Sequence, residues 1–247
     1  MRVVGVIPAR FASTRFPGKL LKQLVDKPIL QWVIELVSKC KSLDDFYVAT
    51  DHEDIFNLCQ ILQVKVIMTS VHLTTGTDRI YEALQKIPAC DIIVNIQGDE
   101  PLLPIEYVDL IVSAMKNNPS VSMATLAHPL SILELENKNS VKVIVNKNNE
   151  AIYFSRFPIP FSREVCNEKI VSCVQKHIGL YGYKTAFLKE FCDTPISFLE
   201  KNESLEQLRA LEMGAKIKVI SVDQPTFGID SEKDLLDLER KLRDEKK

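Results

Sequence analysis

The segment IPARFASTRFPGKLL, residues 7–21, gathers residue types that are suited to polyphosphate chemistry. It carries three cations on one connection together with two hydroxyls and a glycine: Arg10, Arg15, Lys19, Ser13, Thr14 and Gly18. Cationic side chains and free backbone N–H groups are good partners for phosphate oxygens. A solvated basic loop without a ligand has the same composition, so the residues alone leave both interpretations open.

This basic loop lacks the glycine patterns of two common nucleotide sites. A Walker A loop needs a glycine where Ser13 stands and a hydroxyl where Leu20 stands. The pattern G-x-G-x-x-G is also missing, which disfavours a dinucleotide cofactor.

Two aspartates are candidates for a cation site. Asp99, in NIQGDEP (95–101), ends an apolar run, and a carboxylate facing a loop of cations could hold Mg²⁺ beside phosphates. Asp230, in TFGIDSEKDL, stands just before the last helical segment. Each aspartate has an alternative role, Asp99 as a turn residue and Asp230 as the N-cap of that helix.

Three further segments carry polar groups with two interpretations. TTGTDR (74–79) offers Gly76 and hydroxyls before a helix, where they could contact a nucleotide or simply cap the helix. Arg156 in YFSR and His177 in KHIGLYGY are candidate partners of a small acidic ligand. The spacing of the remaining histidines suggests no metal cluster.

These residues follow the elements of an expected α/β fold. Strand-like runs alternate with helical patterns: runs at 3–7, 46–50, 65–68 and 91–97, and helices at 28–40, 52–62 and 77–86. Such alternation predicts a mostly parallel sheet with helices on both faces. The basic loop follows the first strand, so it should lie at the carboxyl edge of the sheet, where open α/β folds bind ligands.

The second half of the chain differs in amino-acid composition. AIYFSRFPIPFSREV is rich in aromatic residues and proline, which indicates an inserted lobe at about 135–198. Helical and strand patterns resume at SLEQLRALEMGAKIKVISV, where Gly214 is a plausible helix stop, and a closing helix is expected over 231–243.

Composition excludes several classes of protein. The 247 residues are 46% hydrophobic and 26% charged, as in ordinary globular chains, and 31 basic against 33 acidic residues give a net charge of −2. Binding to nucleic acid through a basic surface is therefore not favoured. Six cysteines without a C-x-x-C pair, no run approaching the about 18 apolar residues of a spanning helix and no signal-peptide core predict a reduced cytoplasmic protein without membrane insertion.

The ordered motifs resemble the 3-deoxy-manno-octulosonate cytidylyltransferase family, the CMP-KDO synthetases. The resemblance covers nearly the whole chain, through IPARFASTRFPGK, VATDHEDI, GTDR, VNIQGDEPLLP, MATL, SVKV, YFSR, HIGLYGY, LEQLRALEMG and GIDSEKDL. The chain departs from the family pattern at Phe16 and Leu20, where the family has Leu and Pro, and both positions lie off the basic residues.

The resemblance implies a fold, a reaction and an assembly. The fold would be a Rossmann-like, nucleotide-diphospho-sugar transferase-like single domain, 1–247, whose lobe at about 135–198 contributes to the sugar pocket and the dimer interface. The reaction would be transfer of CMP from CTP to the anomeric hydroxyl of 3-deoxy-D-manno-octulosonate (KDO), with release of pyrophosphate and a requirement for Mg²⁺. The homodimer would activate KDO for lipopolysaccharide synthesis.

The resemblance also implies roles for individual residues. The catalytic residues would be Arg10, Lys19 and Asp99, and Mg²⁺ would be held by Asp99 and Asp230. The nucleotide would be bound by Pro8, Ala9, Arg10, Ser13, Arg15, Lys19, Gly76, Thr77, Arg79 and Gln97. The sugar acid would be bound by Gln97, Arg156, His177, Tyr183, Glu206 and Gln207.

Two alternatives of different kinds remain at this point. One is a cytidylyltransferase for another sugar acid such as sialic acid, against which HIGLYGY and LEQLR argue by resemblance. The other is a glycosyltransferase or a non-catalytic nucleotide-sugar binding protein with a similar sheet. Such a protein has no need of the Arg15 and Lys19 pair on the first loop, because its ligand has only a diphosphate.

Overall fold

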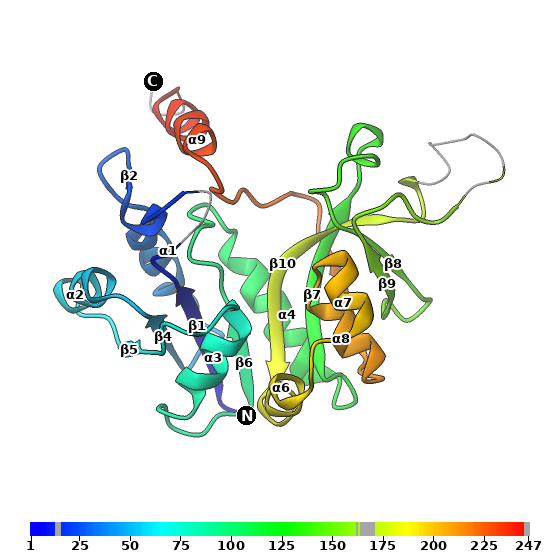
Figure 1. Ribbon diagram of the computed structural model, residues 1–247, viewed down its shortest axis with the longest axis horizontal. Coiled ribbons are helices and arrows are strands. Elements are labelled where there is room, and N and C mark those ends of the chain that lie inside the picture. The colour runs from blue at the N-terminus through cyan, green and yellow to red at the C-terminus, as the bar shows by residue number, and fades with distance from the viewer. Residues whose placement is uncertain (13–15, 162, 164–170, 245–247) are drawn as a thin grey trace. The chain divides into compact units, whose positions relative to one another are not determined.

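The computed structural model describes residues 1–12, 16–161, 163 and 171–244, which form two compact units (Figure 1). The N-terminal unit comprises Met1–Asp109 and Thr226–Lys247, and the central unit comprises Leu110–Pro225. The expected lobe at about 135–198 lies inside the central unit.

The N-terminal unit is built on a four-stranded parallel sheet in the order β6-β1-β4-β5. Its strands are β1 (Val3–Ala9), β4 (Asp45–Thr50), β5 (Val66–Met68) and β6 (Ile92–Asn95). Six of the seven β1 residues are buried, as expected for a strand that pairs on both sides and is covered on both faces. All parallel strands end at one edge, so the loops that follow them converge there.

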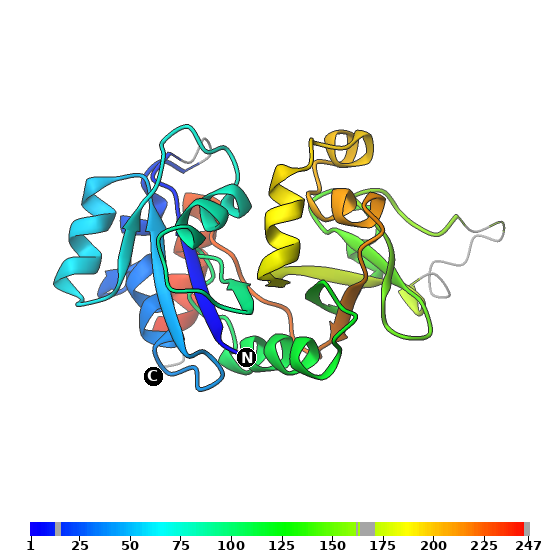
Figure 2. The same ribbon diagram turned by 90° about the horizontal axis from the view of Figure 1, so that it is seen from below.

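Helices cover this sheet on both faces. They are α1 (Ile29–Val37), α2 (Glu53–Ile61) and α3 (Gly76–Leu84), whereas the closing helix α9 (Glu232–Asp244) lies apart from the strands (Figure 1). The α3 helix packs on β1 and β4, and α2 packs on β4 and β5 (Figure 2). The buried residues of α1 recur at helical spacing, Ile29, Leu30, Val33, Ile34 and Val37, so its apolar stripe faces the core.

Short elements complete the N-terminal unit. A single 3₁₀ turn, η1 (Lys19–Leu21), follows the basic loop, and the two-residue strands β2 (Gln23–Leu24) and β3 (Lys27–Pro28) form a small hairpin before α1. Gly18 precedes η1 with φ +64°, a left-handed backbone that favours glycine.

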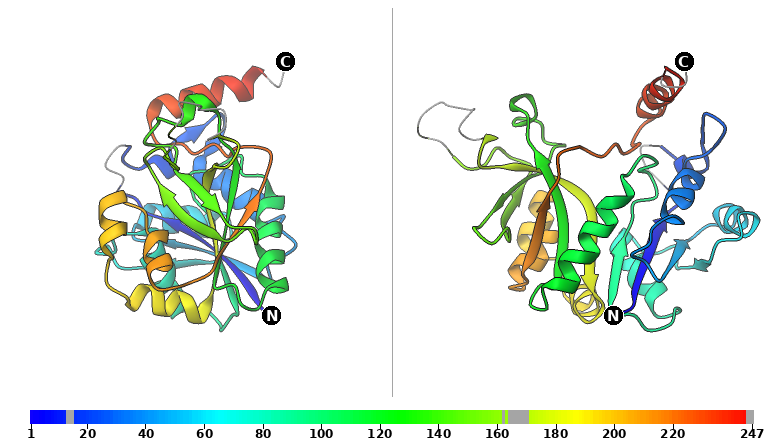
Figure 3. Two further views of the ribbon diagram at one scale, coloured as in Figure 1. Left: turned by 90° about the vertical axis from the view of Figure 1, so that its right-hand side faces the viewer. Right: turned by 180° about the vertical axis from the view of Figure 1, so that it is seen from behind.

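The central unit has a mixed sheet. In its middle lies β7 (Met123–Pro129), antiparallel to β10 (Gln175–Lys184) and parallel to β11 (Ile217–Ser221). The hairpin of β8 (Lys142–Val145) and β9 (Ala151–Ser155) joins through β8 to β10, as the left panel of Figure 3 shows. The remaining elements are the end of α4 (Ile105–Asn117), η2 (Ile132–Glu134), α6 (Thr185–Asp193), α7 (Phe198–Glu203) and α8 (Gln207–Glu212).

One glycine in this unit is required by packing. A Cβ on Gly182 in β10 would come within 2.5 Å of Ile111 and 2.6 Å of Met115, both on α4. Close approach of strand and helix therefore depends on this residue. Gly214 ends the helical segment as expected, with φ +77° after α8.

The expected α/β class is confirmed. The helices and strands that the sequence pattern did not predict lie mainly in the central unit. The parallel strands and the helices at 28–40, 52–62 and 77–86 appear within a few residues of their expected bounds. The α4 helix and the strands β7 and β8 were not assigned from the pattern. Among the described residues, no helix is long and apolar enough to cross a membrane.

Candidate active site

Polar residues follow the parallel strands of the N-terminal unit at their carboxyl ends. Arg10 comes directly after β1, Asp51 directly after β4, and Gln97 and Asp99 follow β6. Sheet geometry therefore places these side chains at one edge, as the sequence predicted for the basic loop and Asp99.

Lys19 joins two distant segments of this unit. Its Nζ donates to the Asp99 carboxylate and to the Ile229 carbonyl oxygen at 2.9 Å, and it lies 3.4 Å from Oδ1 of Asp230. The Lys19 side chain is 13% exposed, against 54% for Asp230. One ammonium group thus sits where two carboxylates and a backbone carbonyl converge, although the aspartates lie 80 and 211 positions away in sequence.

The N-cap of the last helix is not Asp230. Ser231 precedes α9, and its Oγ accepts from the Asp234 backbone N–H at 3.3 Å. The Asp234 carboxylate accepts in return from the backbone N–H groups of Ser231, at 2.8 Å, and Asp230, at 3.1 Å. These reciprocal bonds cap the helix, so the Asp230 carboxylate is not needed for that purpose.

Glu100 is a second acid beside Asp99, but in a different environment. It is 9% exposed, whereas the Asp99 side chain is 25% exposed. Burial, and next the charge of Asp99, raise the pKa of Glu100 to about 7, against a hydrogen bond with the Thr226 side chain that acts in the opposite direction. Of these two adjacent acids, Asp99 is the one that faces a cation.

The GTDR segment (76–79) begins α3, and its side chains are mainly buried or bonded within the protein. Thr75 caps the helix, since its Oγ1 accepts from the Asp78 backbone N–H at 3.0 Å. Thr77 and Arg79 are 4% and 1% exposed. Gly76 lies against Pro8, whose Cγ would be 3.5 Å from a Cβ at that position.

Arg79 forms a buried ion pair that the sequence analysis missed. Its NH2 lies 2.8 Å from Oδ2 of Asp51, and its NH1 donates to Thr69 Oγ1. The only sequence signal for Asp51 was its position directly after a strand, in VATDHEDI. This arrangement commits the guanidinium of Arg79 to the protein itself.

The other expected nucleotide residues have the following places. Arg10 donates from NH1 to the Thr74 carbonyl at 3.1 Å, and Gln97 donates from Nε2 to Asn95 Oδ1 at 3.1 Å. Pro8 and Ala9 are the last residues of β1. Ser13 and Arg15 lie outside the described residues.

In the central unit, Arg156 binds backbone carbonyls. Its Nε, NH1 and NH2 donate to the carbonyls of Glu203, Lys138 and Ser204 at 2.8, 3.1 and 3.3 Å. The buried Lys142 donates in turn to the Arg156 carbonyl at 2.9 Å. Arg156 therefore ties the end of β9 to the end of α7.

His177 lies on β10 within an aromatic cluster. Its Nε2 is 3.0 Å from Thr125 Oγ1, and its ring centroid is 5.2 Å from that of Phe154 and 5.3 Å from that of Tyr181. Burial lowers the pKa of His177 to about 3, so the imidazole is neutral at pH 7. Tyr183, 2% exposed, continues the cluster with its centroid 5.9 Å from that of Tyr181.

Gln207 begins α8, and Glu206 is the N-cap residue before it. The charge of Glu206 helps to raise the pKa of Tyr181, after burial and Tyr183, which places this carboxylate near the aromatic cluster. Gln207 is 3% exposed, and its Nε2 has no hydrogen-bond partner among the described residues. A buried amide donor of this kind is available for an acceptor on a ligand.

Arg209, two residues further along α8, is held by the fold. Its Nε lies 2.9 Å from Oε2 of Glu200, and its NH1 donates to the Phe191 and Thr194 carbonyls. The helix that carries Gln207 is thus fixed to α6 and α7.

Comparison with known proteins identifies the family. The family model described as cytidylyltransferase matches residues 4–217. A 3-deoxy-manno-octulosonate cytidylyltransferase from Bdellovibrio bacteriovorus is 52% identical over 244 residues, which cover 98% of each chain. The chain belongs to this cytidylyltransferase family.

Other members support the assignment. The 3-deoxy-manno-octulosonate cytidylyltransferase of Phocaeicola vulgatus is 47% identical over 98% of each chain. A solved structure of CMP:2-keto-3-deoxy-manno-octonic acid synthetase complexed with CTP matches with a TM-score of 0.93 and 37% identity, covering 99% of this chain and all of that one. The family expected from the motifs is thereby confirmed, and this cytidylyltransferase has the fold of that synthetase.

Proposed function

We propose that this cytidylyltransferase transfers CMP from CTP to KDO. The anomeric hydroxyl oxygen of KDO forms a bond to the α-phosphorus, the bond from that phosphorus to the bridging oxygen breaks, and pyrophosphate leaves while the hydroxyl proton passes to solvent. The observation that supports this reaction best is the meeting of Lys19, Asp99 and Asp230 at the strand ends. The names of the full-length relatives supply the substrates.

The chain's own residues are suited to charge neutralisation and positioning, which this chemistry needs more than covalent help. The Lys19 ammonium and the Arg10 guanidinium can bind phosphate oxygens and stabilise the leaving pyrophosphate. Both lie at the carboxyl edge of the parallel sheet, and Lys19 can exchange its carboxylate partners for phosphate oxygens. Neither a nucleophilic serine nor a cysteine is required.

The donor set at Lys19 fits Mg²⁺. Asp99, Asp230 and the Ile229 carbonyl supply oxygens, the ligand type that this ion prefers, and it commonly uses one or two carboxylates together with phosphates and water. Among the described residues, no group of three or more His, Cys, Asp or Glu side chains could hold a metal, so the pair would rely on substrate oxygens. When bound, Mg²⁺ would orient the nucleophile and offset phosphate charge.

The central unit supplies the proposed groups for the sugar acid. The buried Nε2 of Gln207 can donate to a hydroxyl or carboxylate oxygen, and neutral His177 can form a hydrogen bond without a charge. Among the described residues, three of the five N–H groups of Arg156 donate to backbone carbonyls, and one N–H on each terminal nitrogen could donate to a carboxylate of the substrate. Its second contribution is to hold the segment that leads into Glu206 and Gln207.

Pyrophosphate release tests the reaction and its alternatives. The four nucleoside triphosphates are each combined with KDO and with sialic acid in the presence of Mg²⁺. The proposal expects release with CTP and KDO alone. Equal release with sialic acid would favour the other sugar acid, and no release with any pair would favour a binding protein.

We further propose a cytoplasmic homodimer that activates KDO for lipopolysaccharide synthesis. Its interface would include exposed apolar residues of the central unit, since Ile152, Phe157 and Phe161 are 57%, 67% and 90% exposed. A stable interface should bury at least about 1,000 Å². Sedimentation equilibrium at micromolar concentration should show a dimer, and a 28.0 kDa species would count against it.

A further inference from the structure

Phe11, the residue after Arg10, has three contacts with neighbouring segments. The Phe11 backbone N–H donates to Oδ1 of Asp51 at 3.1 Å, and the Phe11 carbonyl accepts from the Gly18 N–H at 3.1 Å. The Phe11 ring stacks on the imidazole of His52, with centroids 3.7 Å apart and planes inclined by 10°. Phe11 thus connects the end of β4 to both ends of the basic loop.

Gly18 also lies close to the Phe11 ring. A Cβ at Gly18 would lie 3.4 Å from the Phe11 ring, so this ring has Gly18 on one side and His52 on another. Lys19 follows Gly18 directly, and its ammonium binds Asp99. A displacement of Phe11 would therefore move the backbone from which Lys19 projects.

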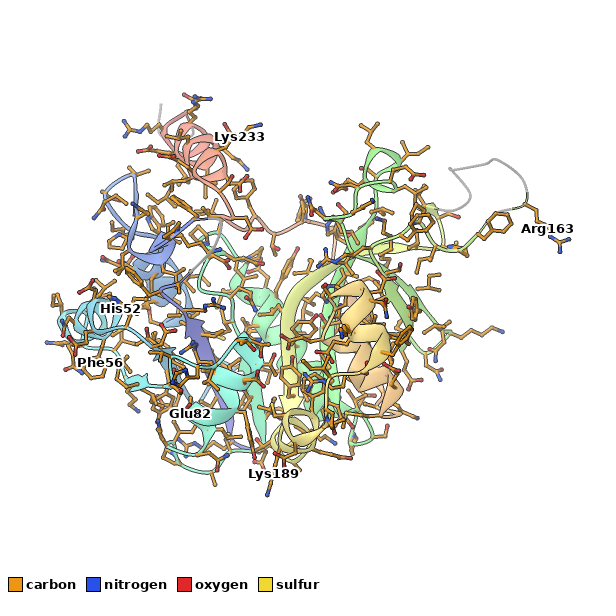
Figure 4. All side chains as sticks on the ribbon, viewed as in Figure 1. His52, Phe56, Glu82, Arg163, Lys189 and Lys233 are labelled. Carbon is orange, nitrogen blue, oxygen red and sulfur yellow. The ribbon has the colours of Figure 1, made fainter. Side chains whose placement is uncertain are left out.

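The partners of Phe11 are themselves fixed to the sheet. Asp51 is paired with the buried Arg79, and His52 stands at the start of α2, where Figure 4 labels it. His52 also caps that helix, since its Nδ1 accepts from the Asp54 backbone N–H at 3.2 Å. The imidazole accordingly has two separable functions, a nitrogen that caps α2 and a ring face that supports Phe11.

We propose that His52 is a positioning residue for cytidylyl transfer. Its ring, through Phe11, holds Gly18 and Lys19 at the place where Lys19 meets Asp99, while Asp51 fixes the Phe11 backbone. This role rests on the proposed function of the basic loop at the triphosphate. Substitution of His52 should change the KM for CTP and not the KM for the sugar acid, because all of the contacts that link His52 to Lys19 lie in the N-terminal unit.

Two substitutions of His52 separate its functions. His52→Asn keeps a good N-cap but removes the ring, and His52→Phe keeps the ring but removes the capping nitrogen. His52→Asn should raise the KM for CTP about 5- to 10-fold, the size expected for an aromatic pair, with Tm and the KM for KDO close to wild type. His52→Phe should lower Tm and restore the KM for CTP.

Phe11→Leu provides a second route to the same readout, because it removes the stacking partner and keeps both backbone hydrogen bonds. It should raise the KM for CTP as His52→Asn does. A wild-type KM for CTP in both His52→Asn and Phe11→Leu overturns the proposal, as does an equal defect in His52→Asn and His52→Phe.

Lys19→Ala distinguishes failure of this inference from failure of the proposed function. Loss of activity in Lys19→Ala with a normal KM for CTP in His52→Asn means that the loop acts on the triphosphate without help from His52. Normal activity in Lys19→Ala means that the loop assignment itself is wrong, and the positioning role falls with it.

Discussion

Two cations, Lys19 in the N-terminal unit and Arg156 in the central unit, were both expected to bind substrate, and the structure uses them differently. Lys19 is paired with the side-chain carboxylates of Asp99 and Asp230, and among the described residues its Nζ donates to one backbone group, the Ile229 carbonyl. Arg156 binds three backbone carbonyls. Carboxylates can pass from an ammonium to a metal ion, whereas carbonyls bound by a guanidinium hold chain segments together. The partners of a cation in a motif therefore indicate its role: carboxylate partners are typical of a ligand site, and backbone carbonyl partners are typical of a structural link.

The largest expected effect is that of Lys19→Ala. Because Lys19 is proposed to bind phosphate oxygens at the leaving group, kcat/KM should fall on the order of 10² or more. Loss of the three hydrogen bonds from its ammonium should lower the free energy of unfolding by about 1–3 kcal/mol, which is too little to unfold the enzyme under assay conditions. Lys19→Arg should not restore full activity, since a planar fork differs from a point charge. Steady-state kinetics and thermal unfolding of both variants measure this, and near wild-type efficiency in Lys19→Ala would refute the assignment.

Asp230→Asn tests whether this carboxylate belongs to the reaction or to the helix. Activity should fall by about 10-fold or more, because Mg²⁺ prefers a charged oxygen, and added Mg²⁺ should recover part of it. Ser231→Ala is the matched control: it should cost about 1 kcal/mol of stability by loss of the cap and leave kcat near wild type. The opposite pattern, a stable, active Asp230→Asn and an inactive Ser231→Ala, would reverse the assignment.

Arg156→Ala should act on both stability and the sugar acid. Loss of three charge-assisted hydrogen bonds should lower the free energy of unfolding by about 1–3 kcal/mol. The KM for KDO should rise far more than that for CTP, because Arg156 lies in the central unit and supports Gln207. Urea unfolding together with the two KM values measures both effects, and equal changes in the two KM values would contradict this division between the units.

The smallest expected effect is the pH dependence contributed by His177. Burial lowers the pKa of His177 from 6.5 to about 3, so below pH 6.5 the unfolded state binds a proton that the native state does not. Stability should therefore fall as the pH drops from 6.5 towards 3, by about 2 kcal/mol between pH 7 and 5. His177→Gln should lose this part of the dependence. Urea unfolding at both pH values provides the test, and identical slopes in the two proteins would exclude it.

Residue patterns alone were enough to predict the α/β class, the parallel strands of the N-terminal unit, the basic loop after the first strand and the family. These features rest on local periodicity and on ordered motifs, which need no knowledge of distant contacts. The residues after β1 and β6 could be placed at one edge for the same reason, because parallel strands end on the same side.

The partners of the polar side chains could be known only from the folded chain. Lys19 meets Asp230 across 211 positions, Arg79 is buried on Asp51, and Arg156 is committed to carbonyls of α7 and the segment before β8. The choice of Ser231 over Asp230 as the helix cap also depended on side-chain geometry. Such pairings follow from how the elements pack and which way each side chain points, and neighbouring residue types do not encode them.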